Sequence, residues 1–193
     1  MKKNLTFLAV IAIIISACST DYTKTNPVCA NIADRFLQAN DNVKHLSIHE
    51  FTVADSVSVD EELTNKINIF RYKHKKAISK YESFFKAGKQ NNAQKWSEEV
   101  EKSGKILKAL DSLKTANESK LSQTLYYCVK FSGYATMYKG KGINLKDWWA
   151  TVSTDGAAIN VQKDNYNLKA AMGDLLPGYS DILKSAGTEE VEP

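Results

Sequence analysis

Two long stretches in the middle of the chain repeat apolar residues at the spacing of an α-helix. The first begins after Ser58, which with Glu61 forms a capping-box pattern, and it extends to Gly88, a residue type that commonly ends helices. The second begins at Asn91 or Asn92 and carries a similar apolar stripe. Because only a short turn separates them, these stretches predict an antiparallel helical hairpin. The stripes contain Leu63, Ile67, Phe70, His74 and Tyr81, and then Trp96, Val100, Ser103, Leu107 and Leu110.

The second half of the chain changes to the alternating pattern of β-strands. Residues 125–138 are rich in tyrosine, valine and phenylalanine and contain no proline, so they predict a central strand. Residues 145–153 and 157–163 predict two further strands, and the Asp155-Gly156 pair between them predicts a two-residue type I′ hairpin. On the central strand, the face expected to meet the helices carries Leu125, Tyr127, Val129, Phe131 and Ala135.

Shorter elements are predicted on both sides of this core. Residues 27–40 begin with a proline and have helical spacing, residues 43–53 alternate as a strand, and residues 166–176 suggest a short helix before Pro177. Residues 182–183 could add one more turn. In the strand, one side is expected to carry His45, Ser47, His49, Phe51 and Val53, and the other side Leu46 and Ile48.

This order of elements is typical of the α+β class. We expect a long antiparallel helical hairpin packed on a small antiparallel β-sheet, a meander that includes the Asp155-Gly156 hairpin. The alternative is a helical hairpin that projects from a small β domain. Since no linker-like segment separates residues 88 and 165, residues 27–186 are expected to form a single α+β domain, followed by a frayed acidic tail over residues 187–193.

The first eighteen residues have the pattern of an export signal. Lys2 and Lys3 precede an apolar run that is too short for a stable membrane span, and small residues follow it. The segment Ile15-Ser16-Ala17-Cys18 resembles the lipobox of bacterial lipoproteins. By this resemblance, residues 1–17 are a removed signal peptide, and Cys18 carries acyl chains such as palmitate that tether the mature protein to a membrane.

The residues after Cys18 complete this interpretation. Ser19 stands where some lipoproteins have an aspartate that signals retention at the inner membrane, so the resemblance favours the outer membrane. Residues 18–26 are polar and are expected to form a flexible tether. The alternatives are an uncleaved N-terminal anchor and an ordinary secretory signal with a chance cysteine.

The overall charge disfavours nucleic acid as a partner. The formal charge of +4 becomes +2 when Lys2 and Lys3 leave with the signal peptide. The lysines of the helices are interspersed with glutamates, and no lysine-rich or arginine-rich block stands out, so we interpret them as a solvated surface.

Two cysteines remain after Cys18. In an extracytoplasmic chain Cys29 and Cys128 could form a disulfide that fixes the N-terminal segment to the sheet. The alternative is that both are small buried apolar side chains, as unpaired cysteines often are.

Candidate chemistry is sparse in this sequence. Aromatic residues on the predicted strands could form an exposed face that stacks against a ligand, or they could only stabilise the sheet. His45 and His49 share a side but lack an obvious third metal ligand, and His74 falls on a helix stripe, so no catalytic residue, metal or cofactor is predicted. The possible ligand face consists of Tyr126, Tyr134, Tyr138 and Trp148, with Trp149 as a further candidate.

These observations favour a lipid-anchored protein of the cell envelope with a non-catalytic domain that binds a protein or a glycan. Two alternatives stay open. One is an envelope hydrolase whose site is assembled from scattered residues. The other is a structural envelope component that associates with itself through the helical hairpin.

Overall fold

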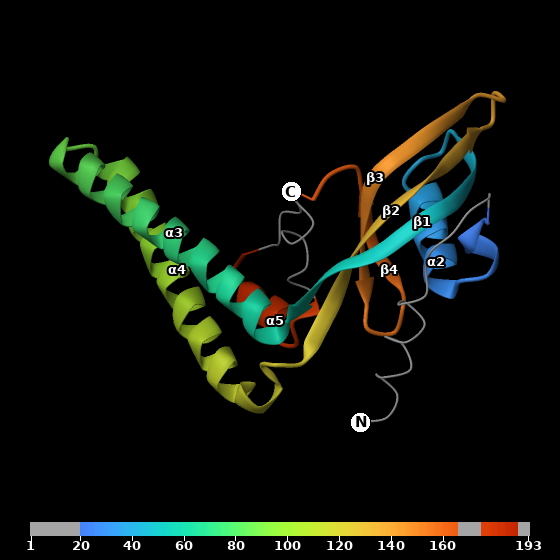
Figure 1. The fold of residues 1–193 in the computed structure, drawn as a ribbon. Coiled ribbons are helices and arrows are strands. Elements are labelled where there is room, and N and C mark those ends of the chain that lie inside the picture. The colour runs from blue at the N-terminus through green and yellow to red at the C-terminus, as the bar shows by residue number, and fades with distance from the viewer. Residues whose placement is uncertain (1–19, 166–174, 189–193) are drawn as a thin grey trace. The chain divides into compact units, whose positions relative to one another are not determined.

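The computed structural model describes residues 20–165 and 175–188 and has the predicted α+β fold. It divides into two compact units, which we describe separately. Among the described residues, the sheet unit comprises residues 20–57 and 124–165, and the hairpin unit comprises residues 58–123 and 175–188. The chain expected to form one domain over residues 27–186 therefore has two compact parts. Figure 1 shows the strands and α2 of the first unit and the two long helices of the second.

The sheet unit contains an antiparallel sheet with the strand order β1-β2-β3-β4. Its strands are β1 (Val43–Ser58), β2 (Thr124–Met137), β3 (Gly142–Ser153) and β4 (Ala158–Gln162). The pairing of β2 with β3 extends from Tyr126 opposite Ser153 to Thr136 opposite Gly142. The predicted meander is confirmed, and the strand predicted over residues 43–53 continues to Ser58.

Helix α2 (Pro27–Gln38) covers one face of this sheet (Figure 1). The helix begins where predicted, because the Asn26 side chain accepts hydrogen bonds from the backbone N–H groups of Val28 and Cys29 and Pro27 fits the first turn. Burying each large apolar side chain contributes about 1.5–3 kcal/mol. Helix α2 packs on the face of β2 that carries Val129, Phe131 and Ala135, because its buried residues share one core with them. The shared core includes Cys29, Ile32, Phe36, Leu46, Ile48, Phe51, Val129, Phe131 and Ala135.

The predicted sides of β1 need one correction. Leu46 and Ile48 are buried together as expected, but Phe51 is buried with them instead of lying beside the exposed His45 and His49. Alternation is interrupted between Ile48 and Phe51, because two consecutive residues, His49 and Glu50, are both exposed. Such an interruption is typical of a β-bulge, which moves every later side chain to the other face.

The turn between β3 and β4 lies where predicted but has a different geometry. Gly156 has φ of 94°, whereas Asp155 keeps a negative φ, so the turn is not type I′. The backbone N–H of Gly156 donates to Ser153, and Ser153 N–H donates to Ala157, as in a type I turn followed by a left-handed glycine. The Asp155 carboxylate explains the change, since it accepts from Ala157 N–H and from the Ser153 hydroxyl.

The described part of the expected tether is ordered. Asp21 accepts hydrogen bonds from the backbone and the hydroxyl of Thr23, and this cap starts the short 3-10 helix η1 (Tyr22–Lys24). The ring of Tyr22 meets that of Phe51 edge-on, with 5.3 Å between centroids. Residues 20–26 are therefore part of the sheet unit, because a capping carboxylate and an aromatic contact hold them.

The hairpin unit confirms the predicted helical hairpin. It contains α3 (Val59–Lys86), α4 (Gln90–Ala116), η2 (Glu118–Lys120) and α5 (Tyr179–Ser185). Ser58 caps α3 by accepting from Glu61 N–H at 3.2 Å, and Gly88 adopts φ of 68° in the turn before α4. The long helices lie side by side (Figure 1), and both predicted stripes contain buried residues, among them Leu63, Ile67, Phe70, Ser103 and Leu110.

Several predictions fall outside the described residues. They concern the signal peptide, Cys18, most of the predicted helix over residues 166–176, and the last five residues of the tail. Within residues 20–165 and 175–188, none of the helices combines the length and the apolar composition that crossing a membrane requires.

Candidate functional site

The four aromatic residues predicted as a ligand face are not gathered on one surface. Trp148 pairs with Phe131 across the strands, so it lies on the α2 side, where its ring meets Phe36 edge-on at 5.2 Å. Tyr126 is fully buried, whereas Tyr134 and Tyr138 are 41% and 69% exposed. The strand register thus separates Trp148 from the exposed tyrosines and gives Trp148 and Tyr126 structural positions.

Cys29 and Cys128 are both buried thiols and are not bonded to each other. Their positions explain why. Cys29 lies in the core between α2 and the face of β2 that carries Val129 and Phe131. Because side chains alternate along a strand, Cys128 points to the opposite face. Burial, with a smaller contribution from Asp21, raises the pKa of Cys29 to about 12, which makes it a poor nucleophile.

The two histidines of β1 do not form a metal centre with other side chains. His45 Nε2 lies 3.5 Å from an Asp21 oxygen and 3.1 Å from the Ser47 hydroxyl. In the part of the chain that the structure describes, no three histidine, cysteine, aspartate or glutamate side chains converge as metal ligands.

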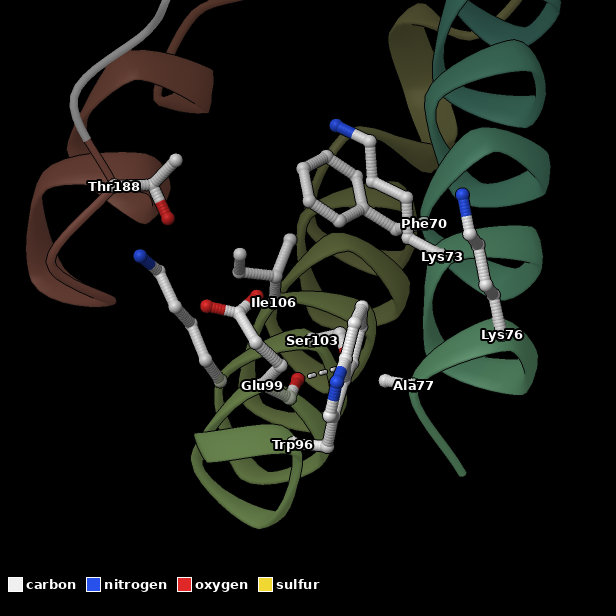
Figure 2. A pocket seen from close by; sticks show the side chains of 10 residues that line it. Phe70, Lys73, Lys76, Ala77, Trp96, Glu99, Ser103, Ile106 and Thr188 are labelled. Atoms are coloured by element: carbon white, nitrogen blue, oxygen red, sulfur yellow. Dashed lines mark hydrogen bonds between the residues drawn. The ribbon is translucent and has the colours of Figure 1, made fainter. Parts of the chain in front are cut away.

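The hairpin unit contains a groove of about 260 Å³ between α3 and α4. Its apolar part consists of Phe70, Ala77, Ile106 and the half-buried Trp96, and Thr188 lines it after α5. The other lining residues are Lys73, Lys76, Glu99, Lys102 and Ser103. Figure 2 shows the Lys76 side chain beside α3, the Lys73 ammonium over the Phe70 ring, and Thr188 on the other side of the groove.

Helical spacing brings these residues together. Phe70, Lys73 and Ala77 follow one another at steps of three and four on α3, and Trp96, Glu99 and Ser103 do the same on α4. Ala77 and Ser103 are small, and they leave space beside the large ring of Trp96. A groove forms where two small residues interrupt otherwise large stripes.

His74 and Ser103 connect the two helices at this groove. His74 Nδ1 lies 2.9 Å from the Ser103 hydroxyl oxygen, which lies 2.6 Å from the carbonyl oxygen of Glu99. Gly104 on α4 accommodates the His74 ring, since an added Cβ would lie 3.4 Å from His74 Cε1. His74 thus packs on the helix stripe as predicted, and it also shares a specific hydrogen bond with Ser103.

Basic residues concentrate on the part of the hairpin around the turn. Residues 71–95 contain eight arginines and lysines and one acidic residue, Glu82, and all nine are exposed. These side chains are solvated, as expected, but in this segment the basic residues are not interspersed with glutamates. Neutral residues separate most of these charges, which is why no block stands out in the sequence. The eight basic residues are Arg71, Lys73, Lys75, Lys76, Lys80, Lys86, Lys89 and Lys95.

No protein-family model, curated protein or solved structure matches this chain.

Proposed function

We propose that this chain is a lipid-anchored protein of the cell envelope, at the outer membrane, whose hairpin unit binds a ligand in the groove without converting it. The anchor part rests on the lipobox-like segment that ends at Cys18. The binding part rests on one observation, the groove that combines an apolar floor with charged and hydroxyl groups at its edge. Ligand sites typically have this mixture, because apolar walls supply affinity and a few polar groups orient the ligand.

The hydrogen bond between His74 and Ser103 bears on the alternative of a hydrolase. A nucleophilic serine must give its proton to the histidine beside it. Here the Ser103 hydroxyl has a closer acceptor, the carbonyl oxygen of Glu99 one helical turn earlier, and His74 Nδ1–H then donates to Ser103. Since a hydroxyl has one proton, this arrangement supports a bond between helices rather than an activated nucleophile.

Native mass spectrometry of the membrane-extracted protein tests both parts. The wild-type protein should have the mass of the chain from Cys18 plus acyl groups, together with a non-covalently bound small molecule. Cys18→Ala should lose the acyl groups, and Ser19→Ala should keep them as the matched control. Trp96→Ala should lose the bound molecule but keep the acyl groups. An unacylated wild-type chain would refute the anchor, and a bound molecule that survives Trp96→Ala would refute the groove as its site.

A further inference from the structure

We propose that the ligand of the groove is a small organic anion, a carboxylate carried on a flat apolar body of one or two rings. This inference rests on the proposed function, since it names the class of molecule that the groove would bind.

The volume limits the size of the ligand. The groove measures about 260 Å³. A cavity of roughly 150 Å³ holds one benzene molecule, and sites for drug-sized ligands begin near 300 Å³. One or two rings therefore fit, whereas a lipid with two acyl chains does not.

The floor favours a flat apolar body. Phe70, Ala77 and Ile106 form an apolar floor and are only 6%, 3% and 1% exposed, so they offer a ligand little polar surface. Trp96 is half-buried and presents part of its indole to the groove. Aromatic rings pack well in offset or edge-on geometry, and Phe70 and Trp96 offer two such partners.

The edge favours a negative charge on the ligand. Lys73, Lys76 and Lys102 outnumber the single acid Glu99, which gives the lining a formal charge of +2. Lys73 Nζ lies 4.8 Å from the centroid of the Phe70 ring, so its charge lies next to the apolar floor. The other basic residues of segment 71–95 lie outside the groove lining and add a weaker, longer-range positive potential that attracts anions to this part of the hairpin.

Thr188 supplies a further reason for a polar ligand group. Its hydroxyl oxygen is buried and has no hydrogen-bond partner among the described residues. Buried hydroxyls are almost always paired, because leaving one unpaired is unfavourable. Thr188 lies across the groove from Lys76 (Figure 2). The oxygen is covered by protein atoms, so a rotation of the Thr188 side chain would be needed to turn its hydroxyl into the groove. There a carboxylate oxygen would accept the Thr188 proton while the charge of the ligand faces the lysines.

Equilibrium dialysis of the native protein in nanodiscs of zwitterionic lipid tests the inference, with empty nanodiscs as the blank. The probes are 2-naphthoate and the uncharged 2-naphthamide, which has nearly the same shape. We expect naphthoate to bind about tenfold more tightly than naphthamide, the ratio that a modest charge interaction gives. The double variant Lys73→Met/Lys76→Met should weaken naphthoate binding about tenfold and leave naphthamide unchanged.

The matched control is Lys86→Met/Lys89→Met, which removes the same charge outside the groove and should reduce affinity less than about twofold at physiological salt. Equal loss in both double variants would show that the anion interacts with the basic surface and would overturn the inference. Equal binding of both probes would overturn the anionic class and leave groove binding intact. Failure of both probes to bind would overturn the groove as a ligand site.

Discussion

The Nδ1 atom of His74 lies 2.9 Å from the hydroxyl oxygen of Ser103, and this contact joins α3 to α4 at the groove. The serine is 6% exposed, so the bond is shielded from water on the Ser103 side. A short polar contact inside an apolar stripe fixes how far one helix can slide along the other, because only one register brings the two side chains together. The same register places Ala77 and Ser103 along one groove.

Ser103→Ala should lower the free energy of unfolding by about 1–2 kcal/mol, because His74 would lose its buried partner. Urea denaturation followed by circular dichroism measures this change. Ser112→Ala is the control, since Ser112 is exposed and also donates to the carbonyl four residues earlier. The free energy of unfolding of Ser112→Ala should stay within about 0.5 kcal/mol of the wild-type value. Equal losses in both variants would mean that the contact with His74 contributes nothing.

Gly104→Ala should stabilise the protein by about 0.5–1 kcal/mol. Glycine inside a helix is less favourable than alanine by this amount. The added Cβ would lie 3.4 Å from His74 Cε1, at the edge of ordinary van der Waals contact. Gly88→Ala should do the opposite and cost about 1–2 kcal/mol, because φ at Gly88 is 68°. A destabilising Gly104→Ala would show that the His74 ring cannot move by even a few tenths of an ångström.

The thiols of Cys29 and Cys128 should be unreactive in the native protein and reactive after unfolding. Both are buried, and the pKa of Cys29 is raised by burial to about 12. A chromogenic thiol reagent added to the native protein should react slowly at neutral pH. In denaturant without reductant it should titrate both thiols. Thiols that appear only after reduction would instead demonstrate the disulfide.

Local signals in the sequence predicted most of the elements. The serine cap at Ser58, the stripes of α3 and α4 and the alternation in β2 all depend on neighbours a few residues away, so the pattern is sufficient to predict them. The Asp155-Gly156 turn was located correctly for the same reason. Its type was wrong, because the Asp155 side chain selects the geometry through hydrogen bonds to Ser153 and Ala157.

The misplaced residues depend on strand irregularities and on the register between strands, which the alternation pattern does not show. Phe51 lies on the buried face because the alternation of exposed and buried residues in β1 is interrupted. Trp148 lies apart from Tyr134 because of the register of β3 on β2. A shift of one residue reverses every side chain of a strand, and the sequence pattern alone does not specify it. The groove was missed for a similar reason. Phe70 and Trp96 were assigned to stripes, but only the register of α3 on α4 shows that the small Ala77 and Ser103 leave space beside them.

Glu62 and Lys66 form a buried ion pair on α3, and breaking it should be costly. Their side chains are 1% and 4% exposed, the charged atoms lie 3.4 Å apart, and the Lys66 ammonium lies 5.3 Å from the Tyr179 ring centroid. Glu62→Gln should lower the free energy of unfolding by about 3–5 kcal/mol, because the buried lysine would lose its counter-charge. Thermal and urea denaturation measure the change.

Two further variants distinguish the effect of the charge pair from the effect of packing the Glu62 and Lys66 side chains. Glu62→Met/Lys66→Met should recover most of the stability, since two apolar side chains need no counter-charge. Glu101→Gln is the matched control, because Glu101 and Lys105 form an exposed pair of the same spacing, and its stability should stay nearly unchanged. A double variant as unstable as Glu62→Gln would show that the packing of these side chains, rather than their charges, stabilises α3.

Asp21 should make the stability of the sheet unit depend on pH in the acidic range. Burial alone would raise the pKa of Asp21, but hydrogen bonds from Thr23, Ser47 and Ile48 together outweigh it and lower the pKa below the ordinary value of 3.8. Since the folded state holds this proton more weakly than the unfolded state, the contribution is fully present above pH 3.8 and is lost as the pH falls through the lowered pKa. Asp21→Asn should therefore have a lower free energy of unfolding than the wild type at neutral pH. The difference between the two free energies should become smaller on acidification. Urea denaturation at neutral and strongly acidic pH measures this difference, with the exposed Asp41→Asn as the control. A difference that stays constant with pH would mean that the charge of Asp21 does not contribute to holding η1 on the sheet unit.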